Sequence, residues 1–430
     1  MSELDSQKSI AIIGSGISGL SCAYLLHSDF KVTVFEKESK LGGHTDTHTI
    51  NIDGKELNID SGFIVFCREH YPHFSKMLDD LEIESEITDM SFSAHNRSTG
   101  LIYNATSINK LFCQRKNLIK PRFYRMLVDL IRFYLTAKNV LDKNDLNTTV
   151  SEYLNTHNYS KTFSEDHLYP MISALWSATP EYVKSYPIRH LVEFLSKHGM
   201  MKIVFRPEWR VVKGGSSKYI KAIKNRLNCE WRTNTKIINV ERSNDEILIN
   251  AGNKVEKYDA VIFATHADQT LTILNQHASD NEKNILGDIP FERNHVVVHT
   301  DESVMHPNKL SWASWNTEVP NKLNPNTLQC CTANYWMNSL QNLKTDTNVF
   351  TSLNTHNDID PSKILIERHY SHPIFTPQSV SAQKQKNEID GYKNSYFVGA
   401  YWGWGFHEDG ARSAAEVCEK IKHNFGISVI

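Results

Sequence analysis

The stretch that decides the fold is KSIAIIGSGISGLSCAYLLHSDFKVTVFEKE, Lys8 to Glu38. Ser9 to Ile13 is a short isoleucine-rich run, typical of a strand that is buried on both faces. It leads directly into a glycine-rich turn, an apolar segment that can form a helix, and a second short strand, KVTVFE. This order of strand, tight turn, helix and strand predicts the first unit of a Rossmann-like sheet.

The glycines of the turn follow the pattern Gly14-x-Gly16-x-x-Gly19. In such a turn Gly14 permits the sharp bend, Gly16 leaves room for a pyrophosphate, and Gly19 lets the helix pack against the strand. The helix then directs its free N–H groups and positive dipole end at the phosphates. Glu36 ends the second strand, where a carboxylate can accept hydrogen bonds from ribose hydroxyls. The alternative is a glycine-rich turn with a purely structural role, but the context favours a dinucleotide site.

A second stretch, KLGGHTDTHTI from Lys40 to Ile50, allows two interpretations. On an extended strand His44, Asp46 and His48 would face the same side, and this set of ligands suits a non-haem iron centre. The Gly42–Gly43 pair instead indicates a backbone that passes very close to a ligand. The acid at the end of the preceding strand favours the second interpretation, so we predict no metal site here.

Five motifs in this order, GGHTDT, DSGFIVF, PMISALWS, ATHAD and GAYWGWGFHEDG, resemble the superfamily of flavin amine oxidases and phytoene desaturases. The chain is most similar to bacterial NAD/FAD-binding, amine-oxidase-like proteins associated with fatty-acyl-modifying enzymes. The resemblance implies an FAD-dependent oxidoreductase that holds FAD without a covalent bond. Two departures stand out: His44 occupies the usual position of an arginine, and Ala400 that of an acid.

The glycine motif and the resemblance together assign a set of residues to the cofactor. These residues are Gly14, Gly16, Ser18, Gly19, Glu36, Lys37, Gly42, Gly43, His44, Asp60, Gly62, Phe63, Ile237, Ala264, Gly399, Gly410 and Ala411. The segment Trp209 to Leu227, with its own glycine pair, resembles a further helix entry of the family. An ordinary helix and strand explain that segment equally well.

The expected fold class is α/β, with a Rossmann-like FAD-binding domain that is discontinuous in sequence. The resemblance assigns residues 1–68, 208–269 and 389–430 to this domain. The intervening residues would form an α+β substrate domain, in which antiparallel strands and helices pack together. Its helical part would span 69–207 and its sheet part 270–388.

His407 and Trp404 are the candidate catalytic residues. The resemblance places the aromatic loop that holds Trp404 over the flavin, and His407 at the position of a tyrosine that polarises the amine in amine oxidases. We expect His407 to accept a proton from the substrate or to orient it; the alternative is a histidine that only bonds to backbone at a helix start. The lysine that relatives keep near the flavin is also absent, since Asn294 and His295 stand in that region.

The leading functional hypothesis is hydride transfer to FAD from a C–H bond of an apolar substrate, such as a fatty acyl chain that becomes desaturated. One alternative is an amine oxidase that produces hydrogen peroxide. Another is a non-redox flavoprotein that binds a lipid or a partner protein.

Composition and charge indicate which partners and which cellular location to expect. Lysine and arginine (47) nearly balance aspartate and glutamate (49), so we expect no nucleic-acid partner. The scattered cysteines predict a cytoplasmic protein with reduced thiols. Basic and aromatic residues alternate over 110–132, and such a segment can make peripheral contact with the inner face of the membrane, although this is the less favoured of two explanations. The alternative for that stretch is the solvated side of helices that pack on the core.

Overall fold

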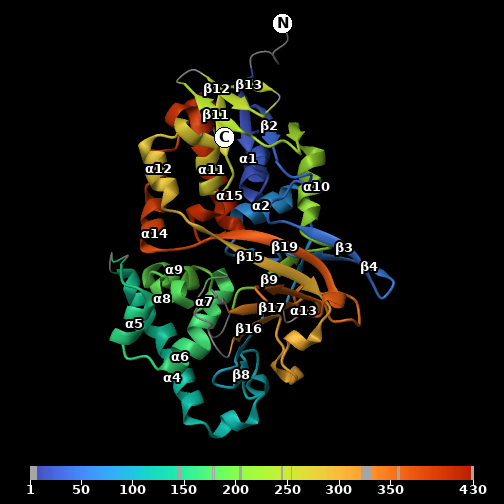
Figure 1. Ribbon diagram of the computed structural model, residues 1–430, viewed down its shortest axis with the longest axis vertical. Helices are drawn as coiled ribbons and strands as arrows, with labels where there is room; N and C mark the ends of the chain where they lie inside the picture. Colours follow the sequence, from blue (N-terminus) through green and yellow to red (C-terminus); the bar gives the residue numbers. More distant parts are fainter. Residues whose placement is uncertain are drawn as a thin grey trace.

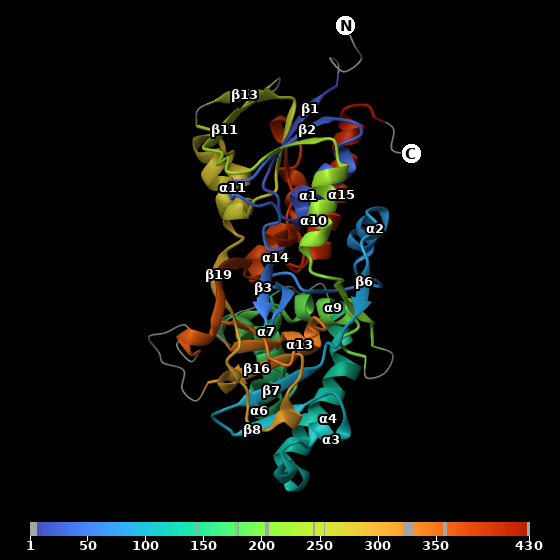
Figure 2. The same ribbon diagram turned by 90° about the vertical axis from the view of Figure 1, so that its right-hand side faces the viewer.

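The computed structural model describes residues 7–142, 145, 147–176, 178, 180–202, 206–243, 246–252, 254–320, 331–355 and 359–427. Figure 1 shows two regions stacked along the long axis of the molecule. A parallel sheet with its helices forms one region, and a larger mixed sheet with a second group of helices forms the other. The first and last elements, β1 and α15, both lie in the region of the parallel sheet (Figure 2).

Five parallel strands form the centre of the first region, in the order β10-β2-β1-β14-β20. Most of their side chains are apolar because both faces of the sheet are covered. The strands come from three separate parts of the chain, and the predicted α/β class with a Rossmann-like domain is confirmed. They are β1 (Ser9–Ile13), β2 (Lys31–Phe35), β10 (Cys229–Arg232), β14 (Ala260–Phe263) and β20 (Ser395–Phe397).

Side chains of β1 alternate between two apolar clusters, one on each face of this sheet. Ile10 and Ile12 pack against the helices of one face, which are α1 (Ile17–Leu26) and α15 (His407–Asn424). Ala11 and Ile13 face the opposite cluster. That cluster is formed by β11 (Asn239–Arg242), β12 (Ile247–Asn250), β13 (Val255–Tyr258), α11 (Ala267–Leu274), α12 (Asp280–Gly287) and α14 (Pro377–Lys384).

A buried ion pair joins the antiparallel sheet β11–β13 to α12. Arg242 donates from Nη1 and Nη2 to the two carboxylate oxygens of Glu282, at 2.6 and 2.7 Å. Both side chains are almost fully buried. Glu282 also accepts a hydrogen bond from the backbone N–H of Ser279 at 2.7 Å, which caps the start of α12.

The second region is built on a seven-stranded sheet in the order β19-β15-β18-β17-β16-β7-β8. All neighbours are antiparallel except β16 and β7. The strands are β7 (Phe92–Asn96), β8 (Leu101–Asn104), β15 (Phe291–His299), β16 (Trp315–Val319), β17 (Thr332–Trp336), β18 (Phe350–Leu353) and β19 (Ile364–Pro373).

Helices lie beside this sheet in the second region (Figure 1). They are α3 (Ile108–Leu111), α4 (Pro121–Thr136), α5 (Val150–Thr156), α6 (Lys161–Phe163), α7 (Tyr169–Trp176), α8 (Pro180–Ser185) and α9 (Ile188–Lys197), with α13 (Met337–Leu340) between β17 and β18. Of these, α7, α8 and α9 lie nearer to the parallel sheet than α4 and α6 (Figure 1). Among the residues described, none of these helices has the length and apolar character that crossing a membrane requires.

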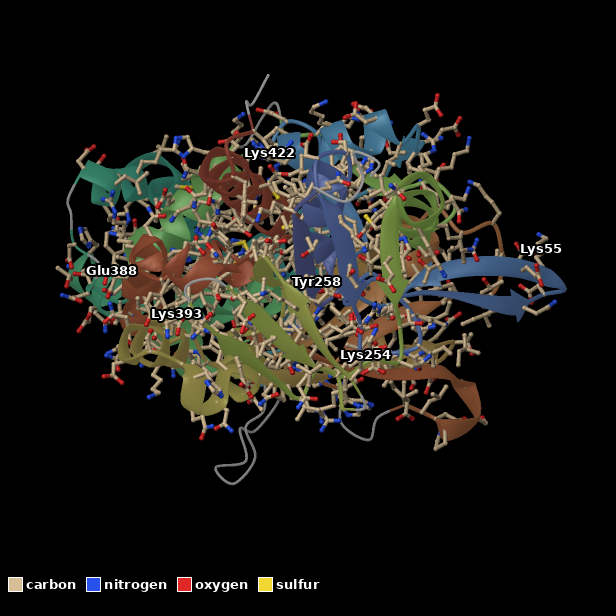
Figure 3. All side chains as sticks on the ribbon, turned by 90° about the horizontal axis from the view of Figure 1, so that it is seen from above. Lys55, Lys254, Tyr258, Glu388, Lys393 and Lys422 are labelled. Atoms are coloured by element: carbon tan, nitrogen blue, oxygen red, sulfur yellow. The ribbon has the colours of Figure 1, made fainter. Side chains whose placement is uncertain are left out.

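Two smaller sheets and two helices connect the regions. The hairpin of β3 (Thr47–Ile52) and β4 (Lys55–Asp60) projects from the body of the molecule, with Lys55 near its tip (Figure 3). The other sheet contains β5 (Val65–Cys67), β9 (Trp209–Val212) and β6 (Ser85–Ile87). The helices are α2 (Pro72–Asp80) and α10 (Ser217–Arg226).

The expectation that residues 69–207 are mainly helical misses part of the large sheet. Within SFSAHNRSTGLIYN, residues 91–104, the structure forms the β7–β8 hairpin, and β6 precedes it. β7 is stable in this place because it pairs in parallel with β16, from Trp315 against Phe92 to Val319 against Asn96. That partner lies more than two hundred residues away in sequence, so local pattern alone does not reveal it.

Candidate active site

One cavity of about 300 Å³ lies where the two regions meet. The parallel-sheet region contributes the ends of its strands and helices, including Gly16, Ser18, Ala264, Gly399 and His407. The mixed-sheet region contributes mostly apolar side chains, including Leu175, Trp176, Val296, Trp315 and Leu353. The cavity therefore joins the predicted dinucleotide loop to an apolar chamber, an arrangement typical of an enzyme that presents a cofactor to a substrate.

The glycines of the Gly14–Gly19 loop have different surroundings. Gly14 has a φ of +102°, and a Cβ there would lie 2.6 Å from the Ala264 carbonyl oxygen. A Cβ on Gly19 would lie 2.0 Å from the Gly14 carbonyl oxygen. Gly16 has an ordinary φ of −65°, and a Cβ there would meet no protein atom within 4 Å. Gly14 and Gly19 thus serve the turn itself, whereas Gly16 faces open space beside the start of α1.

Glu36 lies at the end of β2, next to this loop. Its carboxylate accepts hydrogen bonds from the Ser15 backbone N–H at 3.1 Å and the Ser15 hydroxyl at 2.6 Å. Lys37 is exposed and approaches Glu38 at 3.7 Å. The acid therefore lies where the dinucleotide motif predicts it, and the neighbouring lysine faces solvent.

The segment Gly42–His44 passes directly over the loop. The Gly42 N–H donates to the Ser15 carbonyl oxygen at 3.1 Å, and a Cβ on Gly43 would lie 3.0 Å from the Gly16 Cα. Beside them the Phe63 N–H donates to the His44 carbonyl oxygen at 2.8 Å. A Cβ on Gly62 would come within 2.1 Å of that oxygen, so only glycine fits. These contacts bring the side chain of His44 to the cavity wall.

Asp60 and Ile237 lie apart from the cavity. The Asp60 carboxylate accepts hydrogen bonds from Ser216 at the start of α10, from its N–H at 3.1 Å and its hydroxyl at 2.8 Å. It also accepts one from the Gln341 side chain at 2.8 Å. Desolvation raises the pKa of Asp60 to about 6. Asp60 thus ties α10 to the β3–β4 hairpin, and Ile237 is buried in the cluster behind the parallel sheet.

The helix α15 begins at the cavity. Its first residue is His407, and the Asp409 carboxylate reaches back to accept the Trp404 and Phe406 N–H groups at 3.0 and 3.1 Å. A Cβ on Gly410 would lie 2.7 Å from Ile17 and Ser18 side-chain atoms. Gly410 and the buried Ala411 thus allow α15 to lie close against α1.

His407 and Trp404, the two candidate catalytic residues, both line the cavity. The His407 ring stacks on Phe63 with centroids 3.4 Å apart, and its Nε2 lies 3.1 Å from the Thr45 hydroxyl and 3.2 Å from the Tyr219 hydroxyl. Burial holds the pKa of His407 well below 6.5. The Trp404 indole N–H donates to a backbone carbonyl of α9 at 3.3 Å, so its ring is fixed as part of the wall.

Further histidines, which we did not predict, meet His44 at the cavity. The ring centroid of His44 lies 5.7 Å from that of His266 and 5.4 Å from that of His372. His44 Nε2 and His266 Nδ1 are buried without a hydrogen-bond partner among the described residues. Burial lowers the pKa of His266 and of His372 to about 3, and it also lowers the pKa of His44. All three imidazoles are therefore neutral at pH 7.

Buried neutral histidines make the stability of this protein sensitive to acid. Desolvation lowers six histidine pKa values to about 3 or 4 in the folded state, against about 6.5 in the unfolded chain. Unfolding therefore takes up protons below pH 6.5, and at pH 5 each group costs on the order of 2 kcal/mol of stability. The six are His167, His190, His198, His266, His299 and His372.

The raised pKa values of Asp60 and Asp409, both about 6, oppose this trend by about 1 kcal/mol each at pH 5. We therefore expect the melting temperature to fall steeply between about pH 6.5 and about pH 5. Scanning calorimetry across this range measures it. A melting temperature that stays level or rises toward pH 5 would show that these histidines are not held neutral.

The cavity walls carry no formal charge. Among the described residues that line it, there is no aspartate, glutamate, lysine or arginine. The polar atoms are those of serine, threonine, tyrosine, tryptophan and the neutral histidines. The reacting part of a ligand in this chamber would meet an apolar, uncharged surface.

The described residues also fit a dinucleotide. Gly16 leaves open space at the start of α1, and Glu36 lies at the neighbouring strand end. Two histidines that line the cavity, His44 and His266, each have a buried imidazole nitrogen without a partner among the described residues. Among the described residues no group of three or more histidine, cysteine, aspartate or glutamate side chains could hold a metal ion. Asp46 and His48, the other members of the possible triad, instead interact with each other at 3.3 Å.

Known proteins with solved structures share this fold over almost the whole chain. A conjugated-linoleic-acid-producing fatty acid isomerase from P. acnes aligns with 96% of this chain and 98% of its own, at a TM-score of 0.67 and 15% identity. Cyclohexylamine oxidase from Brevibacterium oxydans IH-35A aligns over 98% and 100%, at a TM-score of 0.72 and 13% identity. No curated protein sequence matches the chain significantly.

A family model also matches the sequence itself. It describes flavin containing amine oxidoreductases and covers residues 17–314, which is more than half of the chain. The match, the parallel sheet and the cavity at the end of its glycine loop agree with one another. The chain belongs to the family of flavin-containing amine oxidoreductases and is an FAD-dependent oxidoreductase.

Proposed function

We propose that this enzyme takes a hydride from a C–H bond of an apolar substrate, such as a fatty acyl chain, which becomes desaturated. The observation that carries this proposal is the uncharged lining of the cavity. A protonated amine bound there would have no carboxylate partner, and burying an unpaired charge is costly. An acyl chain requires no such partner, and its hydrocarbon gains free energy when it leaves water.

FAD, when bound, supplies a two-electron acceptor. The chain supplies the site around the reacting carbon. The apolar side chains of the mixed sheet and α7 exclude water and align a hydrocarbon chain. His407 orients the substrate, because its ring is fixed by the Phe63 stack and two hydroxyl contacts and stays neutral at pH 7. Trp404 forms part of the wall beside it.

Mass spectrometry of whole-cell lipids tests the proposal. Cells that express the protein should contain acyl chains with one additional double bond, two hydrogens lighter than their precursors. Cells that express the Gly16→Val variant, which we expect to fold without binding FAD, provide the matched control. Identical lipid profiles in the two cultures would contradict desaturation of cellular acyl chains.

Isomerisation of a fatty acid is the second candidate, because the fatty acid isomerase from P. acnes has the same fold. In such a reaction a double bond moves and the mass of the acyl chain does not change. Chromatographic separation of products of equal mass would therefore reveal it in the same lipid samples. Hydrogen peroxide release on addition of amines, without any change in lipids, would instead indicate the amine oxidase alternative.

A further inference from the structure

The helix α4 is apolar on two sides. Its inner side places Phe123, Met126 and Phe133 in the main apolar cluster of the second region. Its outer side exposes Tyr124, Val128, Ile131 and Leu135 to between 44% and 73%. The spacing of these four residues is four, three and four, so they form one stripe along the outside of the helix. A helix that only covers a core would carry polar residues there.

The stripe continues into the turn before α4. In the 3-10 helix η2 (Arg115–Ile119), Leu118 is 49% exposed and Ile119 is 84% exposed. The Tyr124 hydroxyl donates to the Leu118 carbonyl oxygen at 2.9 Å, which holds the turn against the helix. Thirteen large apolar side chains are exposed in the described part of the chain, and these two segments contain six of them. We call these six residues the α4 patch.

Basic residues surround the α4 patch. Residues 107–138 contain eight lysines and arginines and a single acid, Asp129. Arg125 and Arg132 share that acid, and Arg122 pairs with the buried Asp166. No carboxylate of the described residues forms an ion pair with the five remaining cations, which are Lys110, Arg115, Lys116, Lys120 and Lys138. The patch is thus an exposed apolar stripe with an uncompensated positive border.

We propose that the α4 patch docks on the surface of an anionic lipid bilayer. Apolar side chains on the outside of a helix enter the acyl boundary, and flanking lysines and arginines contact anionic headgroups. A second copy of the chain fits less well, because a twofold interface would place one positive patch against the other. The patch lies at the end of the molecule farthest from the parallel sheet (Figures 1 and 2). Docking through it would therefore place the parallel-sheet region away from the bilayer.

Docking through α4 also suits the location of the cavity. The inner side of α4 packs in the apolar cluster that contains Trp176, and Trp404 and Phe406 pack against the same cluster. These three residues line the cavity. The helical part of the second region therefore connects the docking surface with the chamber. This docking is independent of the proposed reaction, because it is measured as binding without turnover.

Vesicle flotation tests the inference. The FAD-loaded protein is mixed with vesicles of phosphatidylcholine alone or of phosphatidylcholine with phosphatidylglycerol. We expect the protein to bind the anionic vesicles, with an affinity that falls as salt is added. Its affinity for the neutral vesicles should be lower by about tenfold or more. The double variant Val128→Ser, Ile131→Ser should lose about tenfold or more in affinity for anionic vesicles.

The matched control is Ile238→Ser with Val255→Ser. These residues are 54% and 59% exposed, compared with 47% for Ile131 and 60% for Val128, but they lie in the parallel-sheet region. This variant should float like the wild type, and unchanged thermal melting of both variants shows that each is folded. Equal flotation of the α4 variant and the wild type would overturn the inference. So would a wild-type dimer that the α4 variant abolishes, which would assign the patch to a second copy.

Discussion

Replacing Gly16 by valine should give a folded protein that has lost its affinity for FAD by about 100-fold or more, equivalent to about 2.7 kcal/mol of binding free energy. The backbone at Gly16 has a φ that any residue adopts, and its Cβ position meets no protein atom within 4 Å. The fold therefore tolerates the new side chain. The valine would instead fill the space beside the start of α1, where the pyrophosphate has to approach. Titration of the apoprotein with FAD measures the loss.

Two further glycine variants show whether the loss of FAD affinity is specific to position 16. Gly287→Val changes an exposed glycine at the end of α12 that is equally free of neighbours, and this variant should bind FAD like the wild type. Gly14→Ala should instead destabilise the protein, because Gly14 has a positive φ and its Cβ would clash with a backbone oxygen. A Gly16→Val protein that binds FAD normally would show that this loop does not hold the cofactor.

Removing one partner of the buried ion pair should have the largest effect on stability. In Arg242→Leu the Glu282 carboxylate remains fully buried without its cation, and changes of this type cost about 3–5 kcal/mol. The hydrogen bond from Arg242 to the His277 carbonyl oxygen, 2.7 Å long, is lost as well. Denaturant unfolding of the FAD-loaded protein measures the change in the free energy of unfolding.

The double variant Arg242→Leu, Glu282→Gln separates the charge from the packing. It removes the orphaned negative charge but keeps an amide oxygen that can accept the Ser279 N–H at the start of α12. We expect it to recover at least half of the lost stability. If the double variant is as unstable as Arg242→Leu alone, the loss comes from packing around Arg242 and not from the unpaired carboxylate.

Much of the parallel-sheet region can be predicted because its signals are local. A doubly buried strand is a short apolar run, and the glycine turn follows it without a gap, so β1, α1 and β2 are recognisable within thirty residues of sequence. In contrast, β7 has no local signal that separates it from a loop, because its partner β16 comes from a distant segment.

The candidate active site can likewise be predicted only where its residues belong to local sequence motifs. His44 and His407 belong to recognisable motifs, but His266 and His372 reach the cavity from two other segments, and no spacing rule relates them. The motif that contains Asp60 suggests cofactor contact, yet the structure shows its carboxylate bonded to Ser216 and Gln341. The uncharged cavity lining is likewise a property of the assembled fold, because its residues come from both regions. The assignment of individual residues to FAD stays a prediction.

Anaerobic mixing of the FAD-loaded enzyme with candidate substrates tests the central claim most directly. The visible absorbance of the flavin falls when the flavin accepts the hydride. Dioxygen is excluded because it would reoxidise the flavin and restore the absorbance. We predict that a fatty acyl substrate bleaches this absorbance and that primary amines leave it unchanged, since the cavity offers hydrocarbon contacts and no carboxylate. Bleaching by amines, with no response to acyl chains, would contradict the proposed function.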